Sequence, residues 1–287
     1  MIKVNGHIVP IGVFPNGESY IDIDFDLKTS DVNVITVKFE SDTDLFHLRF
    51  IKDYLDLNRA KAALEIPYLP YSRMDRQEEK RLFTLKSVAN YINSMNFEEV
   101  VVWEPHSEVS VALLDRVKVV NKTHDLALML MRGLLGLAED TTKEELFTQS
   151  VEKGIYLVYP DAGAAKRYQK QFKYQNVITC NKERDFNTGN ITSLTLQTNS
   201  DLGDCKTAII VDDLCSKGGT FLYTAKVLRG KGIEDIHLVV THCENTIFDG
   251  ELLGTDFVKS VITTDSIVSN KTENTKLIVV KEKGVEF

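Results

Sequence analysis

The residues best suited to chemistry lie in one short stretch, 208–221, with the sequence AIIVDDLCSKGGTF. An apolar run leads directly to two adjacent carboxylates, Asp212 and Asp213, and then to a loop with paired glycines. The loop residues are Ser216, Lys217, Gly218, Gly219 and Thr220. Backbone N–H groups of such a loop and the N-terminus of a following helix can bind a phosphate, while the carboxylates accept sugar hydroxyls or hold Mg²⁺. The stretch therefore predicts a site for a phosphorylated sugar.

The same stretch also has a structural interpretation. It could be a strand that ends in a solvated acidic turn before a capped helix, because short motifs recur by chance. The apolar run in front of the carboxylates argues against this.

A segment near the N-terminus has a structural interpretation too. Phe14 could belong to the core, and Asn16 with Gly17 could form a hairpin turn.

Other residues along the chain complete a set that suits phosphoryl transfer. This reaction depends on positioning and on neutralisation of charge more than on a covalent intermediate. Metal ligands and fixed cations are therefore the required residue types. The chain offers them at His106, Asp161, Arg73, Lys182 and Arg184.

Each of these residues also has a structural alternative when it is taken alone. His106 could be a packed or capping imidazole, and Lys182 with Arg184 could lie in a solvated charged turn. Arg73 beside Asp75 could belong to a surface ion-pair cluster that contributes little stability. Only the order of these residues along the chain argues for a joint role.

Six segments resemble, in the same order, motifs of the ribose-phosphate pyrophosphokinases, also called PRPP synthetases. One is the loop described above, which type I phosphoribosyltransferases also carry in a similar form. The others are 14–18 (FPNGE), similar to F-x-N/D-x-E; 67–76 (PYLPYSRMDR), similar to P-Y-x-x-Y-A-R-Q-D-R/K; 104–106 (EPH), where the family has D-L-H; 159–167 (YPDAGAAKR), similar to S-P-D-A-G-G-A-K-R; and 182–184 (KER), which matches K-x-R. Phosphoribosyltransferases lack the segments at 14–18 and 67–76, so the pyrophosphokinases fit better.

The resemblance implies a fold and a division of the chain. It implies an α/β protein with two type I phosphoribosyltransferase-like domains, each a mainly parallel sheet flanked by helices, and an active site between them. We expect an N-terminal domain over residues 1–140, with the adenine and ATP segments. A C-terminal domain over 141–287 would carry the ribose-phosphate loop and the K-x-R segment. The C-terminal tail is a candidate to pack back on the N-terminal domain.

The resemblance also implies a role for each matched residue. ATP would be bound by Phe14, Asn16, Glu18, Arg73 and Asp75, of which the first three would reach the ATP site of a neighbouring subunit. The sugar phosphate would be bound by Asp212, Asp213, Ser216, Lys217, Gly218, Gly219 and Thr220. Mg²⁺ would be held by His106 and Asp161, and the catalytic residues would be Lys182 and Arg184, on a mobile loop, together with His106. The working unit would be a homo-oligomer, a dimer or a hexamer.

The implied reaction is attack by the anomeric 1-hydroxyl of ribose 5-phosphate on the β-phosphorus of Mg·ATP, which releases AMP. Mg²⁺ is the expected cofactor. The loop departs from the family's D-T-x-G-T, because Ser216 and Lys217 remove an acid and add a cation. An acceptor with a diphosphate, ADP-ribose, is therefore the alternative substrate. A phosphoribosyltransferase and a non-catalytic regulatory homologue are further alternatives.

Composition narrows the class of protein. The chain has 287 residues, 43% hydrophobic and 26% charged, which is typical of a folded globular protein. The formal net charge of −8 argues against nucleic acid as a partner. The most apolar stretch, 126–138, carries Arg132 and is too short to span a bilayer, so we expect no membrane role. Four cysteines without CxxC spacing favour the cytoplasm.

The elements that must position these residues can be read from the hydrophobic pattern. Strands are predicted at 62–66, 100–103, 155–158 and 206–211, and helices at 44–57, 82–95 and 220–231. This alternation favours βαβ units with parallel sheets. Polar residues follow the carboxyl ends of the strands, where open α/β sheets bind ligands. The polar segment 138–154 is expected either to join two lobes or to form a surface helix.

Overall fold

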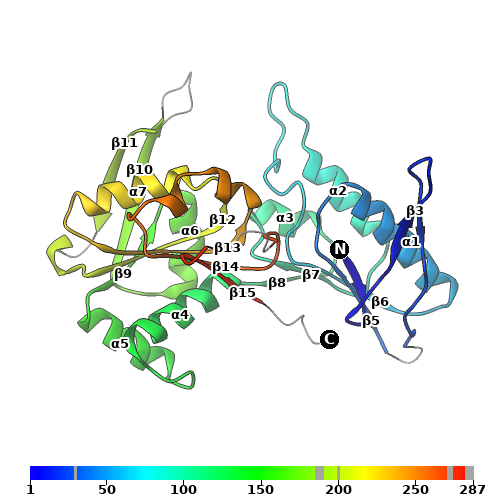
Figure 1. The fold of residues 1–287 in the computed structure, drawn as a ribbon, viewed down its shortest axis with the longest axis horizontal. Coiled ribbons are helices and arrows are strands. Elements are labelled where there is room, and N and C mark those ends of the chain that lie inside the picture. The colour runs from blue at the N-terminus through cyan, green and yellow to red at the C-terminus, as the bar shows by residue number, and fades with distance from the viewer. Residues whose placement is uncertain (29–30, 185–190, 199–200, 270–273, 282–287) are drawn as a thin grey trace. The chain divides into compact units, whose positions relative to one another are not determined.

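The computed structural model shows two compact α/β units, Met1–Val120 and Asn121–Lys281 (Figure 1). It describes residues 1–28, 31–184, 191–198, 201–269 and 274–281. Each unit has its own sheet, in which most neighbouring strands are parallel. The predicted fold class is therefore confirmed. The expected position of the C-terminal tail falls on residues beyond 281, which lie outside the described part of the chain.

The first unit is built on a six-stranded sheet with strand order β2-β1-β5-β6-β7-β8. The strands are β1 (Ile2–Val4), β2 (His7–Ile8), β5 (Asn33–Val37), β6 (Ala62–Ile66), β7 (Val100–Trp103) and β8 (Val117–Val120). The helices are α1 (Thr43–Leu57), α2 (Thr84–Asn93) and α3 (Glu108–Leu113). Strands β5 to β8 are parallel, and their apolar residues pack against Leu48, Ile51 and Leu55 of α1 in one core. A separate hairpin, β3 (Ile11–Val13) with β4 (Ser19–Ile21), completes the unit.

The second unit has a seven-stranded sheet with strand order β11-β10-β9-β12-β13-β14-β15. The strands are β9 (Ile155–Tyr159), β10 (Val177–Arg184), β11 (Ile191–Thr198), β12 (Thr207–Cys215), β13 (Asp235–Cys243), β14 (Ser260–Thr264) and β15 (Leu277–Val280). The helices are α4 (Lys122–Leu135), α5 (Lys143–Glu152), α6 (Ala162–Phe172) and α7 (Gly219–Arg229), with short 3₁₀ turns η1 (Leu202–Asp204), η2 (Asn245–Asp249) and η3 (Leu252–Gly254). All its strand pairs are parallel except β10 with β11.

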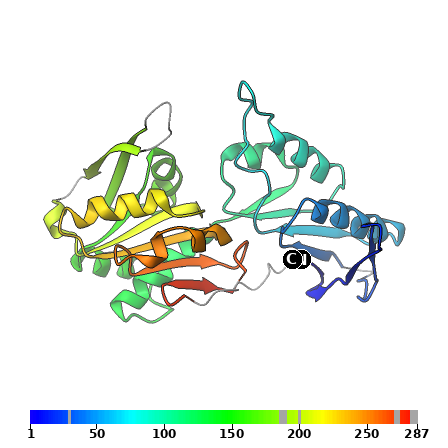
Figure 2. The same cartoon turned by 45° about the horizontal axis from the view of Figure 1, so that its top comes forward.

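Helices cover both faces of this second sheet. Successive strand residues point to opposite faces, so Ile210 of β12 packs in the core under α7, whereas Ile209 and Val211 pack in the core under α4, α5 and α6. In Figure 2, α7 is yellow and the other three helices are green. All four cysteines belong to the core under α7, where they pack as small apolar side chains.

The division of the chain falls earlier than the boundary near residue 140 that the sequence suggested. Helix α4 belongs to the second unit because Leu126, Ala127 and Met131 on its apolar side pack against that unit's sheet. The segment 138–154 contains helix α5, as one of the two expectations had it. The Thr142 side chain caps this helix by accepting a hydrogen bond from the Glu145 N–H at 3.2 Å.

The helices of the structure can be compared with what a membrane-spanning helix requires. Among residues 1–28, 31–184, 191–198, 201–269 and 274–281, none of the helices combines the length and the apolar character needed to cross a bilayer. The most apolar stretch of the sequence, 126–138, lies mostly within α4, and the apolar side of this helix packs within the second unit.

A buried histidine gives a testable pH dependence of stability. His237 of β13 is 7% exposed, with Nδ1 2.8 Å from Ser260 Oγ and Nε2 3.3 Å from Asp235 Oδ1. Burial lowers the pKa of His237 despite the opposing effect of Asp235. The unfolded chain therefore binds more protons than the folded one below about pH 6.5. We expect the free energy of unfolding to fall as pH decreases through this region, and His237→Gln to reduce that slope in urea titrations; an unchanged slope would contradict the assignment.

Candidate active site

The first unit brings two predicted segments to one edge of its sheet. Strands β6 and β7 are parallel neighbours, so their carboxyl ends meet, and the Trp103 N–H donates to the Pro67 carbonyl at 3.1 Å. The segment 67–76 with Arg73 follows β6, and His106 follows β7. Arg73 is exposed and His106 is half-buried. The segments that carry Arg73 and His106 therefore both start at the carboxyl edge of this sheet.

The turn that presents Arg73 is fixed to helix α1. Tyr71 has a left-handed backbone (φ 63°), its carbonyl accepts from the Met74 N–H at 2.9 Å, and its hydroxyl donates to the Asp42 carboxylate before α1. The hydrogen bond to Asp42, together with burial, raises the pKa of Tyr71. Arg73 lies inside this turn and is exposed, whereas Asp75 beyond it is half-buried.

The predicted adenine segment forms the tip of the β3–β4 hairpin. Gly17 has a left-handed backbone (φ 91°), which a tight turn of this kind requires. The Asn16 amide donates to Glu18 Oε2 at 2.8 Å, and the Glu18 N–H donates to Asn16 Oδ1 at 3.2 Å. Phe14 is 51% exposed and stacks on Tyr20 at 4.8 Å between ring centroids. The hairpin turn is confirmed, and the alternative that Phe14 belongs to the core is wrong.

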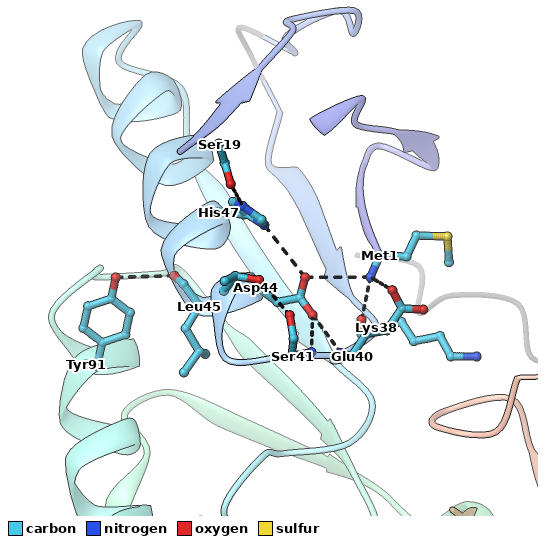
Figure 3. A network of polar contacts seen from close by, with 10 residues as sticks. Met1, Ser19, Lys38, Glu40, Ser41, Asp44, Leu45, His47 and Tyr91 are labelled. Carbon is cyan, nitrogen blue, oxygen red and sulfur yellow. Dashed lines mark hydrogen bonds and ion pairs between the residues drawn. The ribbon is translucent and has the colours of Figure 1, made fainter. Parts of the chain in front are cut away.

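Next to its tip, this hairpin is fastened to helix α1 (Figure 3). His47 Nε2 lies 2.9 Å from Ser19 Oγ of β4, and His47 Nδ1 lies 3.9 Å from Asp44 Oδ1. Asp44 also accepts from the backbone N–H groups of Glu40 at 2.7 Å and Ser41 at 3.0 Å. The exposed tip with Phe14, Asn16 and Glu18 is therefore held at Ser19, the residue that directly follows it.

The second unit gathers three carboxylates at the corresponding edge of its sheet. Strands β9 and β12 are parallel neighbours. Asp161 follows β9 and caps α6, with Oδ1 accepting from the Ala164 N–H at 2.9 Å. Burial, followed by the negative charges of Asp213 and Asp161, raises the pKa of Asp212 well above its usual range. Asp161 and Asp212 therefore lie close enough to repel each other, and a cation would relieve that repulsion.

Strand β12 continues farther than the sequence indicated. The prediction ended the strand at residue 211, but Asp212 and Asp213 lie within it. Asp213 is 5% exposed and forms an ion pair with Arg167 of α6, at 3.0 Å between Oδ1 and Nη1. The segment 159–167 was recognised as a motif, yet nothing in the sequence signalled a role for Arg167, because its partner is far away along the chain.

The glycine loop is supported on one side by the segment 244–254. Gly218 has a left-handed backbone (φ 79°), and a Cβ there would lie 2.7 Å from Leu252 Cδ2. A Cβ on Gly250 would lie 2.0 Å from the Lys217 carbonyl oxygen, so the two backbones are in close contact. This support from residues 244–254 had no signal in the motif itself.

The other side of the loop is open. A Cβ on Gly219 would meet nothing within 4 Å, and Lys217 is exposed, whereas Ser216 and Thr220 are half-buried. Gly219 and Thr220 are the first residues of α7, so their backbone N–H groups have no acceptor in the helix ladder. This arrangement can accept an anion at the helix N-terminus.

Lys182 and Arg184 belong to a strand and not to a loop or charged turn. In the β10–β11 pair, Lys182 lies opposite Leu194 and Arg184 opposite Ile191, with an irregularity in register between Glu183 and Arg184. Their side chains and residues 185–190 lie outside the described part of the structure. Their catalytic role therefore stays a prediction.

The residues present fit a magnesium ion that is bound largely by phosphates and water. The described residues contain no group of three or more His, Cys, Asp or Glu side chains that could hold a metal by itself. Mg²⁺ usually takes one or two carboxylates and fills its octahedron with water and substrate phosphates. Asp161 and Asp212, which act on each other electrostatically, supply such carboxylates. The pairing of His106 with Asp161 as metal ligands stays a prediction, because the two residues belong to different units.

Comparison with known proteins gives matches over most of the chain. The family described as the N-terminal domain of ribose phosphate pyrophosphokinase matches residues 2–95. The ribose-phosphate pyrophosphokinase of Sulfurisphaera tokodaii is 30% identical over 261 residues, 89% of this chain and 83% of that protein. The one from Sulfolobus acidocaldarius is 29% identical over 265 residues, with the same coverage. The crystal structure of phosphoribosylpyrophosphate synthetase from Mycobacterium smegmatis has a similar fold, with a TM-score of 0.71 at 19% identity, and covers 96% of this chain and 86% of its own.

The contact between Gly250 and the loop can be tested by adding one methyl group. We expect Gly250→Ala to lower the free energy of unfolding by about 1–3 kcal/mol, because its Cβ would overlap the Lys217 carbonyl oxygen and displace the loop. Gly254→Ala is the matched control, since its Cβ would meet nothing within 4 Å. Urea unfolding of both variants gives the comparison, and equal stability would mean that the segment does not support the loop.

Proposed function

Because the chain belongs to the ribose-phosphate pyrophosphokinase family, we propose that it transfers the diphosphoryl group of ATP to the anomeric 1-hydroxyl of ribose 5-phosphate, with release of AMP. The family makes the chain a diphosphotransferase enzyme. The observation that carries the choice of sugar is the glycine loop, which follows the carboxylates of β12, is open at Gly219 and ends at the N-terminus of α7.

The second unit would bind the sugar phosphate. Backbone N–H groups of the loop residues Ser216, Lys217, Gly218, Gly219 and Thr220 would surround the 5-phosphate, and Lys217 would add a positive charge. The carboxylates Asp212 and Asp213 were both predicted to serve the ribose. A carboxylate beside the ring accepts hydroxyl hydrogen bonds and so fixes the orientation of the 1-hydroxyl.

ATP would be bound by Arg73 and Asp75, with His106 and Asp161 as the Mg²⁺ ligands. When bound, Mg²⁺ neutralises negative charge on the phosphate oxygens of ATP. Arg73 is exposed in its anchored turn, which suits a cation that must meet a phosphate. Lys182 and Arg184 would neutralise the charge that develops on the oxygen leaving with AMP. No covalent intermediate with the enzyme is required.

We also propose that the chain works as a homo-oligomer, a dimer or a hexamer, in which the tip with Phe14, Asn16 and Glu18 reaches the ATP site of a neighbouring subunit. Apolar side chains are exposed around the hairpin and on α1. They are Ile8, Val13, Phe14, Tyr20, Ile23, Phe46 and Phe50. Apolar residues that are exposed together favour a protein–protein contact.

The other candidate functions have less support. The ADP-ribose alternative depends only on the extra positive charge of the loop, and the relatives from S. tokodaii and S. acidocaldarius are named for ribose-phosphate. A phosphoribosyltransferase would not explain the match to the pyrophosphokinase N-terminal domain over residues 2–95. A non-catalytic homologue has no reason to keep His106, Asp161, Lys182, Arg184 and Asp212 together.

A first prediction concerns the acceptor. We expect AMP to form from ATP and Mg²⁺ when ribose 5-phosphate is added, and not when ADP-ribose replaces it at the same concentration. Coupled detection of AMP and chromatography of the PRPP product give the measurement. If ribose 5-phosphate produces no AMP above the rate without acceptor, the proposed function is wrong.

A second prediction concerns Lys182 and Arg184. We expect Lys182→Ala and Arg184→Ala to lower kcat by about 10²–10³ with the KM for ATP within a few-fold, because their charge acts mainly in the transition state. Lys166→Ala, which removes an exposed cation from α6, is the control for a general loss of positive charge. Equal losses in kcat and in ATP affinity would contradict the assigned role.

A further inference from the structure

The adjacent carboxylates of β12 have different surroundings, although the sequence presents them as a pair. We propose that Arg167 is a positioning residue that holds Asp213 as its internal counter-ion, so that Asp212 is the carboxylate of the pair that meets the sugar. This inference rests on the proposed function for the identity of the sugar. It differs from the sequence-based prediction, in which both carboxylates bind ribose.

The contact between Arg167 and Asp213 is close and largely shielded from water. Nη1 and Oδ1 are 3.0 Å apart, and the exposed fractions of the two side chains are 22% and 7%. The Arg167 guanidinium also lies 5.7 Å from the centre of the Tyr168 ring. Burial disfavours the charge on Arg167, but the attraction of Asp213, together with the contributions of Tyr168 and Asp212, outweighs it and raises the pKa of Arg167. Arg167 is therefore charged and supplies a positive charge to the buried Asp213 carboxylate.

The two carboxylates differ in what they contact and in how far they are exposed. Asp213 is buried, and its carboxylate pairs with Arg167 of α6. Asp212 is only half-buried, and no ion pair to it is found among the described residues. The glycine loop follows both residues along the chain and leads into α7. Of the two carboxylates, Asp212 is therefore the one that remains for a sugar bound at the loop.

Backbone contacts fix this arrangement. The Asp213 N–H donates to Asp212 Oδ1 at 2.9 Å, which orients the Asp212 carboxylate. The Asp212 carbonyl accepts from Thr123 Oγ1 at 3.0 Å, and Thr123 Oγ1 lies 2.8 Å from Thr241 Oγ1 of β13. A shift of Asp213 would be transmitted to Asp212 through their shared backbone. Arg167 can therefore affect sugar binding without touching the sugar.

Charge gives a second reason for the pairing. Asp161, Asp212 and Asp213 would place three negative charges at the end of two neighbouring strands. Without Arg167, Asp213 would lose this compensating charge while it stays buried, which is costly to folding. With Arg167 in place, the excess negative charge is that of Asp161 and Asp212, and these two remain to meet a cation or hydroxyl groups.

The test compares Arg167→Met, Asp213→Asn and the double variant in the full-length enzyme. Methionine keeps much of the arginine volume, and Asn is close in shape to Asp. We expect each single variant to lower Tm by roughly 6 °C or more, because one buried charge loses its partner. We expect the double variant to recover most of this loss. If the losses in Tm of the two single variants simply add in the double variant, the proposed ion pair is wrong.

Steady-state kinetics of the same variants test the assignment of Asp212. We expect the KM for ribose 5-phosphate to rise about tenfold in Arg167→Met while the KM for ATP stays within about twofold, since the effect acts through the sugar site. In the double variant the sugar KM should return to within about threefold of wild type, because no carboxylate that touches sugar has been removed. Recovery of Tm without recovery of this KM would overturn the proposal, because it would mean that Asp213 itself binds the sugar.

Asp212→Asn provides the matched comparison. It should raise the sugar KM in the wild-type background and in the double variant alike, and a wild-type-like KM would overturn the assignment of Asp212 to the sugar. If the wild-type enzyme forms no AMP from ribose 5-phosphate, the proposed function fails. The Tm values of the single and double variants would still show whether Arg167 and Asp213 compensate each other.

Discussion

The second unit depends on how it compensates negative charge at the carboxyl ends of β9 and β12. Asp161, Asp212 and Asp213 all lie at this edge, and a low dielectric makes their mutual repulsion strong. Arg167 neutralises one of them from α6. The mutual repulsion of Asp161 and Asp212 is unfavourable, and a bound cation or sugar hydroxyls would relieve it. An acidic edge of this kind destabilises the protein without its ligands and favours binding, which is the usual relation between a functional site and stability.

A contact that fastens an exposed segment to a neighbouring element recurs in the candidate binding segments. The hairpin at Phe14 is fastened through Ser19 to His47, and the turn at Arg73 is fastened through Tyr71 to Asp42. The glycine loop rests on Gly250 and Leu252. In each case the fastening contact lies within the same unit as the segment it holds. Little free energy is then lost in ordering these segments when a ligand binds.

The sequence predicted local features well where a residue type determines them. Gly17 in the hairpin and the helix that starts after Gly218 follow from backbone conformations that few residues adopt. The apolar period of α1 and the runs of β6 and β7 predicted those elements closely. The family resemblance then supplied the order of the motifs, which single residues could not.

The features that the sequence did not predict come from contacts between distant segments. The end of β12 was placed too early because charged residues normally end a strand, whereas Asp213 is kept inside by Arg167. The unit boundary was placed too late because α4 looks the same in sequence whichever sheet it covers. The contact of Gly250 with Lys217 is between two backbones and has no side-chain signature. Tertiary partners, and not local propensity, therefore decide which polar residues of the candidate site face a ligand and which stabilise the fold.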